Sequence, residues 1–458
     1  MFDWWNIGGE VLVSIVLCTY NRAYILKETI DSILEQTYSD FELIIVDDGS
    51  TDNTQNLLSE YTDSRIRSFV LEENSYYCAA ANFGIKQVQG DYVAFATSDD
   101  TWEPEKLEKQ IDYLDKRKEC GACFTFAKVI DEKGEDATEK YPNISEPLHK
   151  NLHTRRAWIQ RLIFGGNCIC HPSAVIRREV LNAVGGYNLY YSRLADMDLW
   201  LRILRYFPIH MIEKELVNYR CFENAEEQIS GVTEKGIIKT VNESMLIRRN
   251  FVNSLSDEEM LNFFEDCFYY KEAYSHQELE IEKAFLLKEC VKEVPELWVL
   301  GMEKFEELLR DEEKVQILKE TYHIKVQDIY KWNEKSFYKD CAVIHRMGIQ
   351  EQVIAKRQEQ LKEYEDRNRQ LLERQSVLEK MLYEANESNE SLEGRIYQLT
   401  KNVEELKENQ QNEKREAQIK DKMLKEIKEE NAQVKKSLNQ ALLEKLSLQE
   451  NAGKRGKK

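Results

Sequence analysis

Two adjacent carboxylates, Asp99 and Asp100, directly follow a largely apolar segment, Val93–Ser98. We expect a buried strand there, and two like charges at its carboxyl end cost free energy unless a cation lies against them. Mg²⁺ and Mn²⁺ take oxygen ligands, commonly one or two carboxylates together with substrate phosphates. The sequence therefore predicts a Mn²⁺ or Mg²⁺ site for a phosphate-bearing substrate. The alternative is a helix start, in which Asp100 caps the segment Glu103–Lys116.

The elements that must position these acids alternate between strands and helices. Val11–Arg22 and Phe41–Asp52 are apolar runs that end in polar turns, which is typical of buried parallel strands. Between them, Ala23–Gln36 has apolar residues at helical spacing, so the unit is β-α-β. The alternation continues to Asp100. It predicts an α/β fold with a doubly wound sheet, in which the strand ends meet in one crevice.

Several short motifs occur in a fixed order: Ser14–Arg22, Ile45–Asp52, Asn82–Gly84, Gly90–Val93, Ser98–Asp100, His171–Arg178, Val184–Tyr187 and Ala195–Arg202. Each motif is weak alone, but in this order and spacing they resemble the family 2 glycosyltransferases of the GT-A fold. The resemblance covers about half of the chain. It implies a Rossmann-like nucleotide-binding half and an acceptor half.

The resemblance also implies roles for individual residues. Tyr20 would lie against the nucleotide base, and Asp48 would accept the imide N–H of uracil; their structural alternatives are a turn aromatic and turn formation before Gly49. Asp99 would contact the ribose and Asp100 would hold the metal. The predicted nucleotide-sugar-binding set is Thr19, Tyr20, Asn21, Asp48, Asn82 and Asp99.

Asp196 corresponds to the catalytic acid of the family and stands at the start of the amphipathic segment Met197–Tyr206. A helix N-terminus favours the anionic carboxylate, which is the form that a general base needs; the alternative is a plain N-cap. Attack by a hydroxyl that Asp196 activates would invert the anomeric centre. By resemblance, His171 and Trp200 belong to the acceptor region.

The sequence departs from the family pattern at three positions. Ser98 replaces a frequent acid, Ala81 replaces a frequent Arg, and Ala195 replaces the Glu often found beside the catalytic acid. The predicted reaction is inverting transfer of a hexosyl or N-acetylhexosaminyl group from a UDP- or dTDP-sugar. The predicted acceptor is a hydroxyl of a glycan, a lipid-linked glycan or a surface-polysaccharide precursor. A catalytically inactive coiled-coil scaffold that binds a nucleotide or glycan is the alternative.

Composition excludes other classes. A formal charge of −19 and a pI near 5.1 argue against nucleic-acid binding. Neither a secretory leader nor a run of about 18 apolar residues is found, so we expect a cytoplasmic protein. The basic end Gly453–Lys458 could add peripheral contact with the inner face of a membrane. Cys120 with Cys123, and Cys168 with Cys170 and His171, could each supply half of a zinc site, but reduced and mostly buried thiols are the favoured state.

The predicted domains are the catalytic domain at 1–227, a helical extension at 228–347, a coiled coil at 348–450 and a basic disordered tail at 451–458. In the coiled coil, apolar residues keep one heptad register, and Asn368, Asn389 and Asn431 fall at a positions. This pattern predicts a parallel homodimer; a single charged helix is the alternative. The apolar a positions are Ile354, Leu361, Leu382, Ile396, Val403, Ala417, Leu424 and Leu438, and d positions include Tyr364, Leu371, Leu378, Leu399 and Leu406.

Overall fold

The structure is a computed structural model that describes residues 12–224, 231–289, 298–332, 341–387 and 393–455, with side chains left undescribed at 341–351, 385–387, 393, 426–428 and 430–455. The chain forms two compact units, Met1–Lys339 and Asp340–Lys458. Within the described residues, no helix is both long enough and apolar enough to cross a bilayer. The predicted cytoplasmic location stays a prediction.

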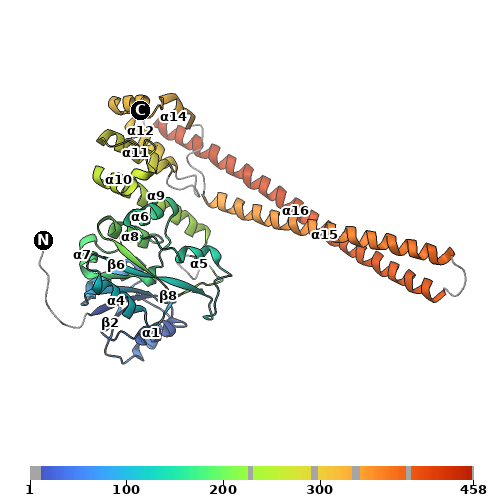
Figure 1. Cartoon of the computed structure of the whole chain (residues 1–458), viewed down its shortest axis with the longest axis horizontal. Helices are drawn as coiled ribbons and strands as arrows, with labels where there is room; N and C mark the ends of the chain where they lie inside the picture. Colours follow the sequence, from blue (N-terminus) through green and yellow to red (C-terminus); the bar gives the residue numbers. More distant parts are fainter. Residues whose placement is uncertain (1–11, 225–230, 290–297, 333–340, 388–392, 456–458) are drawn as a thin grey trace. The chain divides into compact units, whose positions relative to one another are not determined.

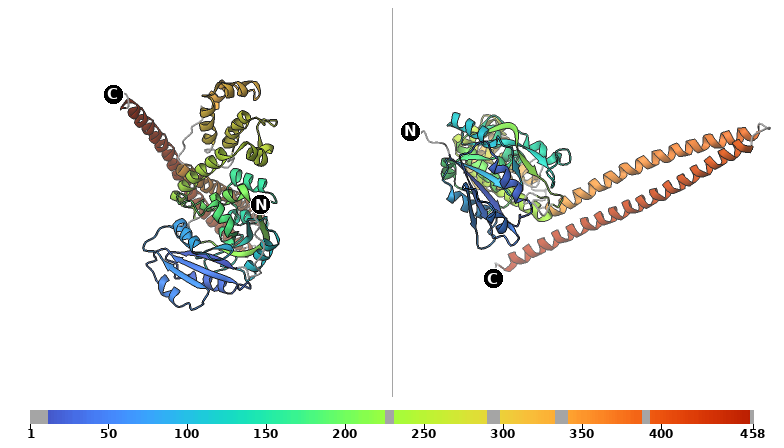
Figure 2. Two further views of the ribbon diagram at one scale, coloured as in Figure 1. Left: turned by 90° about the vertical axis from the view of Figure 1, so that its left-hand side faces the viewer. Right: turned by 90° about the horizontal axis from the view of Figure 1, so that it is seen from below.

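An eight-stranded mixed sheet with the order β3-β2-β1-β4-β7-β6-β8-β5 lies at the centre of the first unit (Figures 1 and 2). β1 pairs in parallel with β2 and β4, and β2 with β3, while β7 is antiparallel to β4 and β6. This order confirms the predicted doubly wound GT-A type sheet. The strands are β1 Val13–Thr19, β2 Phe41–Asp47, β3 Ile66–Val70, β4 Tyr92–Thr97, β5 Thr101–Trp102, β6 Ala122–Ile130, β7 Val175–Arg177 and β8 Ile209–Arg220.

The central strands are apolar throughout because both faces of the sheet are covered. Along β1, Val16 and Cys18 belong to one core cluster, whereas Ile15 and Leu17 belong to the other. Helices α1 and α4 cover the second face, and α3, α6 and α8 cover the first. The helices of this part are α1 Leu26–Leu34, α2 Thr54–Ser59, α3 Tyr77–Gln87, α4 Lys106–Lys116, α5 Pro142–Leu148, α6 Arg155–Gly165, α7 Arg178–Val184 and α8 Ala195–Tyr206.

The register of the parallel strands aligns their polar ends. Thr19 lies opposite Asp47, and Cys18 lies opposite Thr97. The turns that follow β1, β2 and β4 therefore meet at one edge of the sheet, as predicted. Helix α4 begins at Lys106, with Glu105 at the N-cap position, so Asp100 does not cap it.

The helical extension packs on α6 and α8 within the same compact unit. Ile247 and Phe251 of α9, together with Phe263 of α10, join the core cluster beneath α8. Arg205 of α8 donates two hydrogen bonds to Glu259 of α10, both at 2.6 Å. The helices are α9 Glu234–Ser254, α10 Asp257–Phe264, α11 His276–Glu289, α12 Val299–Leu308, α13 Glu312–Glu320 and α14 Val326–Trp332.

The second unit consists of two long helices, α15 Cys341–Glu387 and α16 Glu393–Arg455, which run side by side (Figures 1 and 2). Arg367 pairs with Glu413, and Lys407 pairs with Glu379, each at 3.7 Å. The later α15 residue, Glu379, pairs with the earlier α16 residue, Lys407, and the earlier one, Arg367, pairs with the later one, Glu413. The two helices are therefore antiparallel.

The predicted heptad register matches the exposure pattern of this pair. Val403 and Leu424, both at a positions, are 6% and 7% exposed, while Ile419 at a c position is 60% exposed. The seam that the sequence predicts to pair with a second chain is covered here within one chain, because α15 and α16 pack against each other. Asn389 and Asn431 lie outside the residues with described side chains.

Candidate active site

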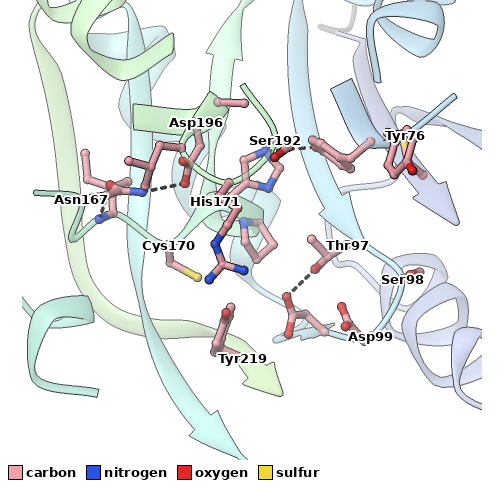
Figure 3. A pocket seen from close by; sticks show the side chains of 18 of the residues that line it. Tyr76, Thr97, Ser98, Asp99, Asn167, Cys170, His171, Ser192, Asp196 and Tyr219 are labelled. Carbon is pink, nitrogen blue, oxygen red and sulfur yellow. Dashed lines mark hydrogen bonds between the residues drawn. The ribbon is translucent and has the colours of Figure 1, made fainter. Parts of the chain in front are cut away.

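A cavity of about 610 Å³ lies at the aligned strand ends (Figure 3). One side is lined by the turns after β1, β2 and β4, which contribute Tyr20, Asp48 and Asp99. The opposite side is lined by residues of the acceptor half, including Asn167, His171 and Asp196. The fold thus brings four of the six predicted nucleotide-binding residues, Thr19, Tyr20, Asp48 and Asp99, into one pocket with the predicted base.

Among the predicted nucleotide-binding residues, Thr19 is the last residue of β1 and Tyr20 follows it. The backbone N–H of Asp48 donates to the carbonyl oxygen of Thr19 at 2.9 Å. The hydroxyl of Thr19 is buried and has no hydrogen-bond partner among the described residues. A buried polar group without a partner costs free energy, so a ligand that bonds to it would be favoured. Tyr20 is 40% exposed, which leaves its ring available for stacking.

Asp48 is fixed in the pocket wall by its neighbours. Its Oδ1 accepts hydrogen bonds from the backbone N–H of Ser75 at 2.9 Å and from the Ser75 hydroxyl at 2.6 Å. The turn requires Gly49, whose φ is +75° and whose added Cβ would lie 2.9 Å from the backbone carbon of Glu73. Oδ2 of Asp48 is the oxygen that these bonds leave for a ligand.

Asp99 and Asp100 follow β4. Oδ1 of Asp100 accepts from the backbone N–H of Arg220 at 2.7 Å, and Oδ2 accepts from the hydroxyl of Thr97. The guanidinium of Arg220 donates to the backbone carbonyl of Asp99 at 2.9 Å and forms an ion pair with Glu28 at 2.7 Å. Arg220, at the end of β8, therefore holds the turn that presents both acids.

The electrostatics of this turn fit a divalent cation. Burial raises the pKa of Asp99, although the charges of Arg22 and Arg220 oppose the rise. Burial, followed by the charge of Asp99, raises the pKa of Asp100. A cation beside the pair would reverse both effects. The described residues contain no group of three His, Cys, Asp or Glu side chains that could hold a metal. The remaining ligands would therefore come from substrate phosphates and water.

Asp196 lies in the first turn of α8, where Leu194 is the N-cap residue. Its Oδ2 accepts a hydrogen bond from the side-chain amide of Asn167 at 2.6 Å, and its Oδ1 accepts from the backbone N–H of Met197 at 2.7 Å. Burial raises the pKa of Asp196 to about 6, against these hydrogen bonds, which lower it. The carboxylate is ionised at neutral pH, yet it is a stronger base than an exposed aspartate.

His171 lines the pocket but belongs to an aromatic cluster. Its Nε2 lies 2.7 Å from the hydroxyl of Tyr187 and 3.1 Å from that of Tyr77. Its ring stacks on Phe95 with a centroid distance of 5.5 Å. Because burial lowers the pKa of His171 to about 4, the imidazole is neutral at physiological pH.

Three predicted site residues do not line the pocket. Asn21 has a φ of +52° and accepts a hydrogen bond from the backbone N–H of Thr51 at 2.8 Å, so it joins two turns. Asn82 forms two hydrogen bonds of 2.8 Å with the backbone of Tyr187. Trp200 is buried against Phe124. The partners cited for these three residues do not line the pocket either, so the three residues serve the fold around it.

The sequence argument missed several residues that line the pocket. Arg22 and Arg193 bring positive charge, and Asn167 holds Asp196. Arg22 ends the motif Ser14–Arg22, so its place near the acids could have been predicted from the sequence. Asn167 and Arg193 lie in loops outside any motif, and only the fold brings them to the pocket.

The cysteines form no zinc site within the described part of the chain. All eight cysteines described there are free, and seven of them are buried. The burial of seven of these eight agrees with the prediction of mostly buried thiols, and their reduced state stays a prediction.

The arrangement defines a class of protein: an α/β nucleotide-binding enzyme fold with an acidic turn and an opposing carboxylate. Residues 14–185 match the family model described as Glycosyl transferase family 2. The chain is 32% identical over 217 residues to "Putative teichuronic acid biosynthesis glycosyltransferase TuaG" of Bacillus subtilis, across 47% of this chain and 81% of that protein. The chain belongs to glycosyltransferase family 2.

Other relatives are longer. An "Uncharacterized glycosyltransferase" of Rickettsia felis is 34% identical over 254 residues, and the match covers 55% of this chain and 40% of that protein. The matched region thus spans less than half of this relative's length.

Among solved structures, the crystal structure of S. aureus TarS 1-349 is similar at 18% identity, covering 68% of this chain and 91% of that one with a TM-score of 0.40. Mannosyltransferase PcManGT from Pyrobaculum calidifontis, in complex with GDP-Man and Mn²⁺, is similar at 15% identity, covering 66% and 76% with a TM-score of 0.41. The fold assignment rests on the strand order and the family match.

Proposed function

We propose that this protein is a metal-dependent, inverting glycosyltransferase that moves a sugar from a nucleoside diphosphate to a hydroxyl group of a glycan. The observation that supports this most is Asp196, a half-buried carboxylate held by Asn167 in the same pocket as Asp48, Asp99 and Asp100. A scaffold that only bound nucleotide would need no positioned base on the opposite wall.

In the proposed reaction, the acceptor hydroxyl attacks the anomeric carbon while its proton passes to the carboxylate of Asp196. The bond from the anomeric carbon to the nucleoside diphosphate breaks, and the configuration inverts. Asn167 and the backbone N–H of Met197 orient the carboxylate and stay hydrogen-bonded to it. Positioned general bases typically contribute about 10²–10⁴ in rate.

Asp100 would hold Mn²⁺ or Mg²⁺ together with diphosphate oxygens. A bound metal ion supplies Lewis-acid stabilisation of negative charge on the departing nucleoside diphosphate. The pocket also contains Arg22 and Arg193, whose guanidinium groups could contact the same phosphates. These two arginines could replace the contact that is missing because Ala81 stands where relatives carry Arg.

Asp48 supports a uracil or thymine base in the donor. Its Oδ2 can accept the imide N–H of these bases, whereas cytosine would present an acceptor to a carboxylate. Tyr20 would stack on the base. The type of sugar, hexosyl or N-acetylhexosaminyl, is part of the proposal without a residue assigned to it.

The proposed acceptor is a glycan, either lipid-linked or a precursor of a surface polysaccharide. The name of the Bacillus relative, which mentions teichuronic acid biosynthesis, supports this class. Ile144, Pro147 and Leu148 line the acceptor side of the pocket and offer an apolar surface to a sugar ring. The predicted parallel homodimer is not part of the proposal, because α15 and α16 already cover the seam that it would use.

A panel of nucleotide sugars tests the proposal. The full chain is incubated with UDP-, dTDP-, GDP- and CDP-sugars in the presence of Mn²⁺ or Mg²⁺, and release of the nucleoside diphosphate is measured with and without EDTA. Metal-dependent release from a UDP- or dTDP-sugar is expected. Absence of release from every donor, with UDP still bound, would favour the inactive scaffold.

A further inference from the structure

Glu243 is a buried carboxylate of the helical extension that contacts the catalytic half directly. It lies on α9 and is only 4% exposed. Its Oε1 accepts hydrogen bonds from the backbone N–H of Ser192 at 2.8 Å and from the Ser192 hydroxyl at 2.9 Å. Its Oε2 accepts from the backbone N–H groups of Arg193 at 2.9 Å and Leu194 at 2.8 Å.

These four bonds hold the loop 192–194, which leads into α8. A helix usually begins with a side chain that accepts from its first backbone N–H groups, but Leu194 at the N-cap has no such acceptor. Glu243 supplies its negative charge to this region from another helix, where the α8 dipole also favours an anion. In all four hydrogen bonds the carboxyl oxygens of Glu243 are the acceptors.

The loop that Glu243 holds forms part of the pocket. Ser192, Arg193 and Leu194 all line it, and Asp196 follows two residues after Leu194. The guanidinium of Arg193 is also held from α9, since it donates to the hydroxyl of Thr240 at 2.8 Å. Thr240 and Glu243 lie three residues apart, on one face of α9.

We propose that Glu243 is a positioning residue for the transfer reaction: by holding loop 192–194 from the helical extension, it fixes Asp196 and sets the charge around it. This inference rests on the proposed role of Asp196 as the base. It gives the helical extension a part in the chemistry, and nothing in the motifs of the catalytic half indicates such a part.

The surroundings of Asp196 support an electrostatic effect of Glu243. Beyond burial, the negative charge of Glu243 helps to raise the pKa of Asp196. The thiols of Cys78 and Cys170 and the hydroxyl of Tyr187 also face Asp196, but burial raises the pKa of each, so they are neutral at pH 7. Arg193, whose backbone N–H bonds to Glu243, is the positive side chain on the same loop.

Glu243→Gln in the full chain tests the proposal. In Gln the amide nitrogen replaces one carboxylate oxygen and faces the hydrogen-bond donors of loop 192–194, to which it cannot bond as an acceptor. About half of the hydrogen bonds are therefore lost together with the charge. We expect kcat for the donor selected by the panel to fall roughly tenfold, the scale of one lost hydrogen bond to a charged group. We also expect the acidic limb of the pH profile to move to lower pH. Binding of UDP with Mn²⁺, measured by calorimetry, should weaken less than kcat falls, because Arg193 is the only side chain of this loop assigned to the phosphates.

Glu259→Gln is the matched control, because Glu259 also joins the extension to α8 but bonds to Arg205 in the last turn. It should lower the melting temperature without moving the pH profile. If Glu243→Gln moved only the melting temperature, as the control does, the inference would be overturned. If Asp196→Asn kept full turnover, the proposed function itself would fail.

A second variant tests the proposal in case Glu243→Gln does not fold. Glu243→Asp keeps the charge but shortens the side chain, so kcat should fall while the acidic limb stays in place. Unchanged kcat in this variant would contradict the positioning role.

Discussion

At the residue scale, a substitution of Asp100 tests the proposed metal site without changing the other proposed site residues. Asp100→Asn keeps the size of the side chain and its place beside Thr97 and Arg220 but removes the charge. We expect Mn²⁺-dependent UDP binding to weaken roughly 100-fold, the upper end of the range for residues that support metal sites. Calorimetric titration with UDP, with and without Mn²⁺, measures this.

Asp115→Asn is a suitable control, because Asp115 lies on α4, where it bonds to the hydroxyl of Tyr92 rather than lining the pocket. Equal metal-dependent affinity in Asp100→Asn and Asp115→Asn would remove Asp100 from the metal site.

Asp48 should decide which base is bound. Wild-type protein is expected to bind UDP more tightly than CDP by tenfold or more, since a hydrogen bond to a charged group is worth about 1.5–3 kcal/mol. Asp48→Asn should remove most of this preference. Asp52→Asn, in the same turn but bonded to Ala23 and Thr54, should retain it. A wild-type protein that binds UDP and CDP equally would show that Asp48 serves only the turn.

The pKa of Asp196 predicts opposite effects of pH on stability and on activity. Burial raises this pKa to about 6 in the folded protein, whereas an unfolded aspartate titrates near 3.9. The folded state therefore binds the proton more tightly, so the stabilisation is complete below about pH 4 and is lost as the pH rises through about 6. Activity should increase over the same range, because the base must be ionised.

Two measurements check this prediction. The stability of wild type relative to Asp196→Asn, taken from chemical unfolding, should fall between pH 4 and pH 7, while the pH profile of wild-type turnover should show an acidic limb near pH 6. A stability difference that is the same at both pH values would contradict the raised pKa.

At the scale of elements, the α15–α16 pair depends on its buried seam. Leu424 is 7% exposed at an a position, so Leu424→Ala should destabilise the pair by about 2–5 kcal/mol. Ile419→Ala removes a similar side chain that is 60% exposed, and it should change stability by less than about 0.5 kcal/mol. Helicity followed by circular dichroism during heating compares the two variants. Equal effects would contradict the buried seam between the two helices.

The sequence was a good guide to elements whose pattern is local. Apolar strands that end in polar turns identified β1, β2 and β4, because each run is buried on both faces. The heptad register of the last 100 or so residues was also predictable. The partner of the seam was not, because a heptad pattern fixes which face is buried and leaves open whether the covering helix belongs to the same chain.

For the pocket, the sequence correctly predicted the lining residues that directly follow the end of a strand. Asp48, Asp99 and Asp100 needed only the strand positions to be brought together. It failed for Asn21 and Asn82, because a polar residue in a motif can serve the backbone instead of a ligand. It also gave no sign of Glu243, whose role arises from hydrogen bonds between α9 and the loop before α8, about 50 residues earlier in the sequence.

At the scale of the whole molecule, the residues assigned to chemistry all lie in the first compact unit. Its sheet presents the nucleotide-binding turns, and its helical extension holds the loop before the base. The second unit is a helical hairpin to which no chemistry is assigned. We therefore expect the reaction to depend on residues 12–332 and the hairpin to serve another purpose in the chain.

The central claim is that Asp196 is the base of a glycosyl transfer. The most direct test uses the donor that the nucleotide-sugar panel selects and compares its turnover in wild type, Asp196→Asn and Asp198→Asn. Binding of UDP with Mn²⁺ is measured for each protein. Asp198 lies on the same helical turn but forms an ion pair with Arg202 at 2.8 Å. The account predicts that Asp196→Asn binds UDP normally and loses about 10²–10⁴ in rate, while Asp198→Asn stays active. Full turnover by Asp196→Asn would contradict it.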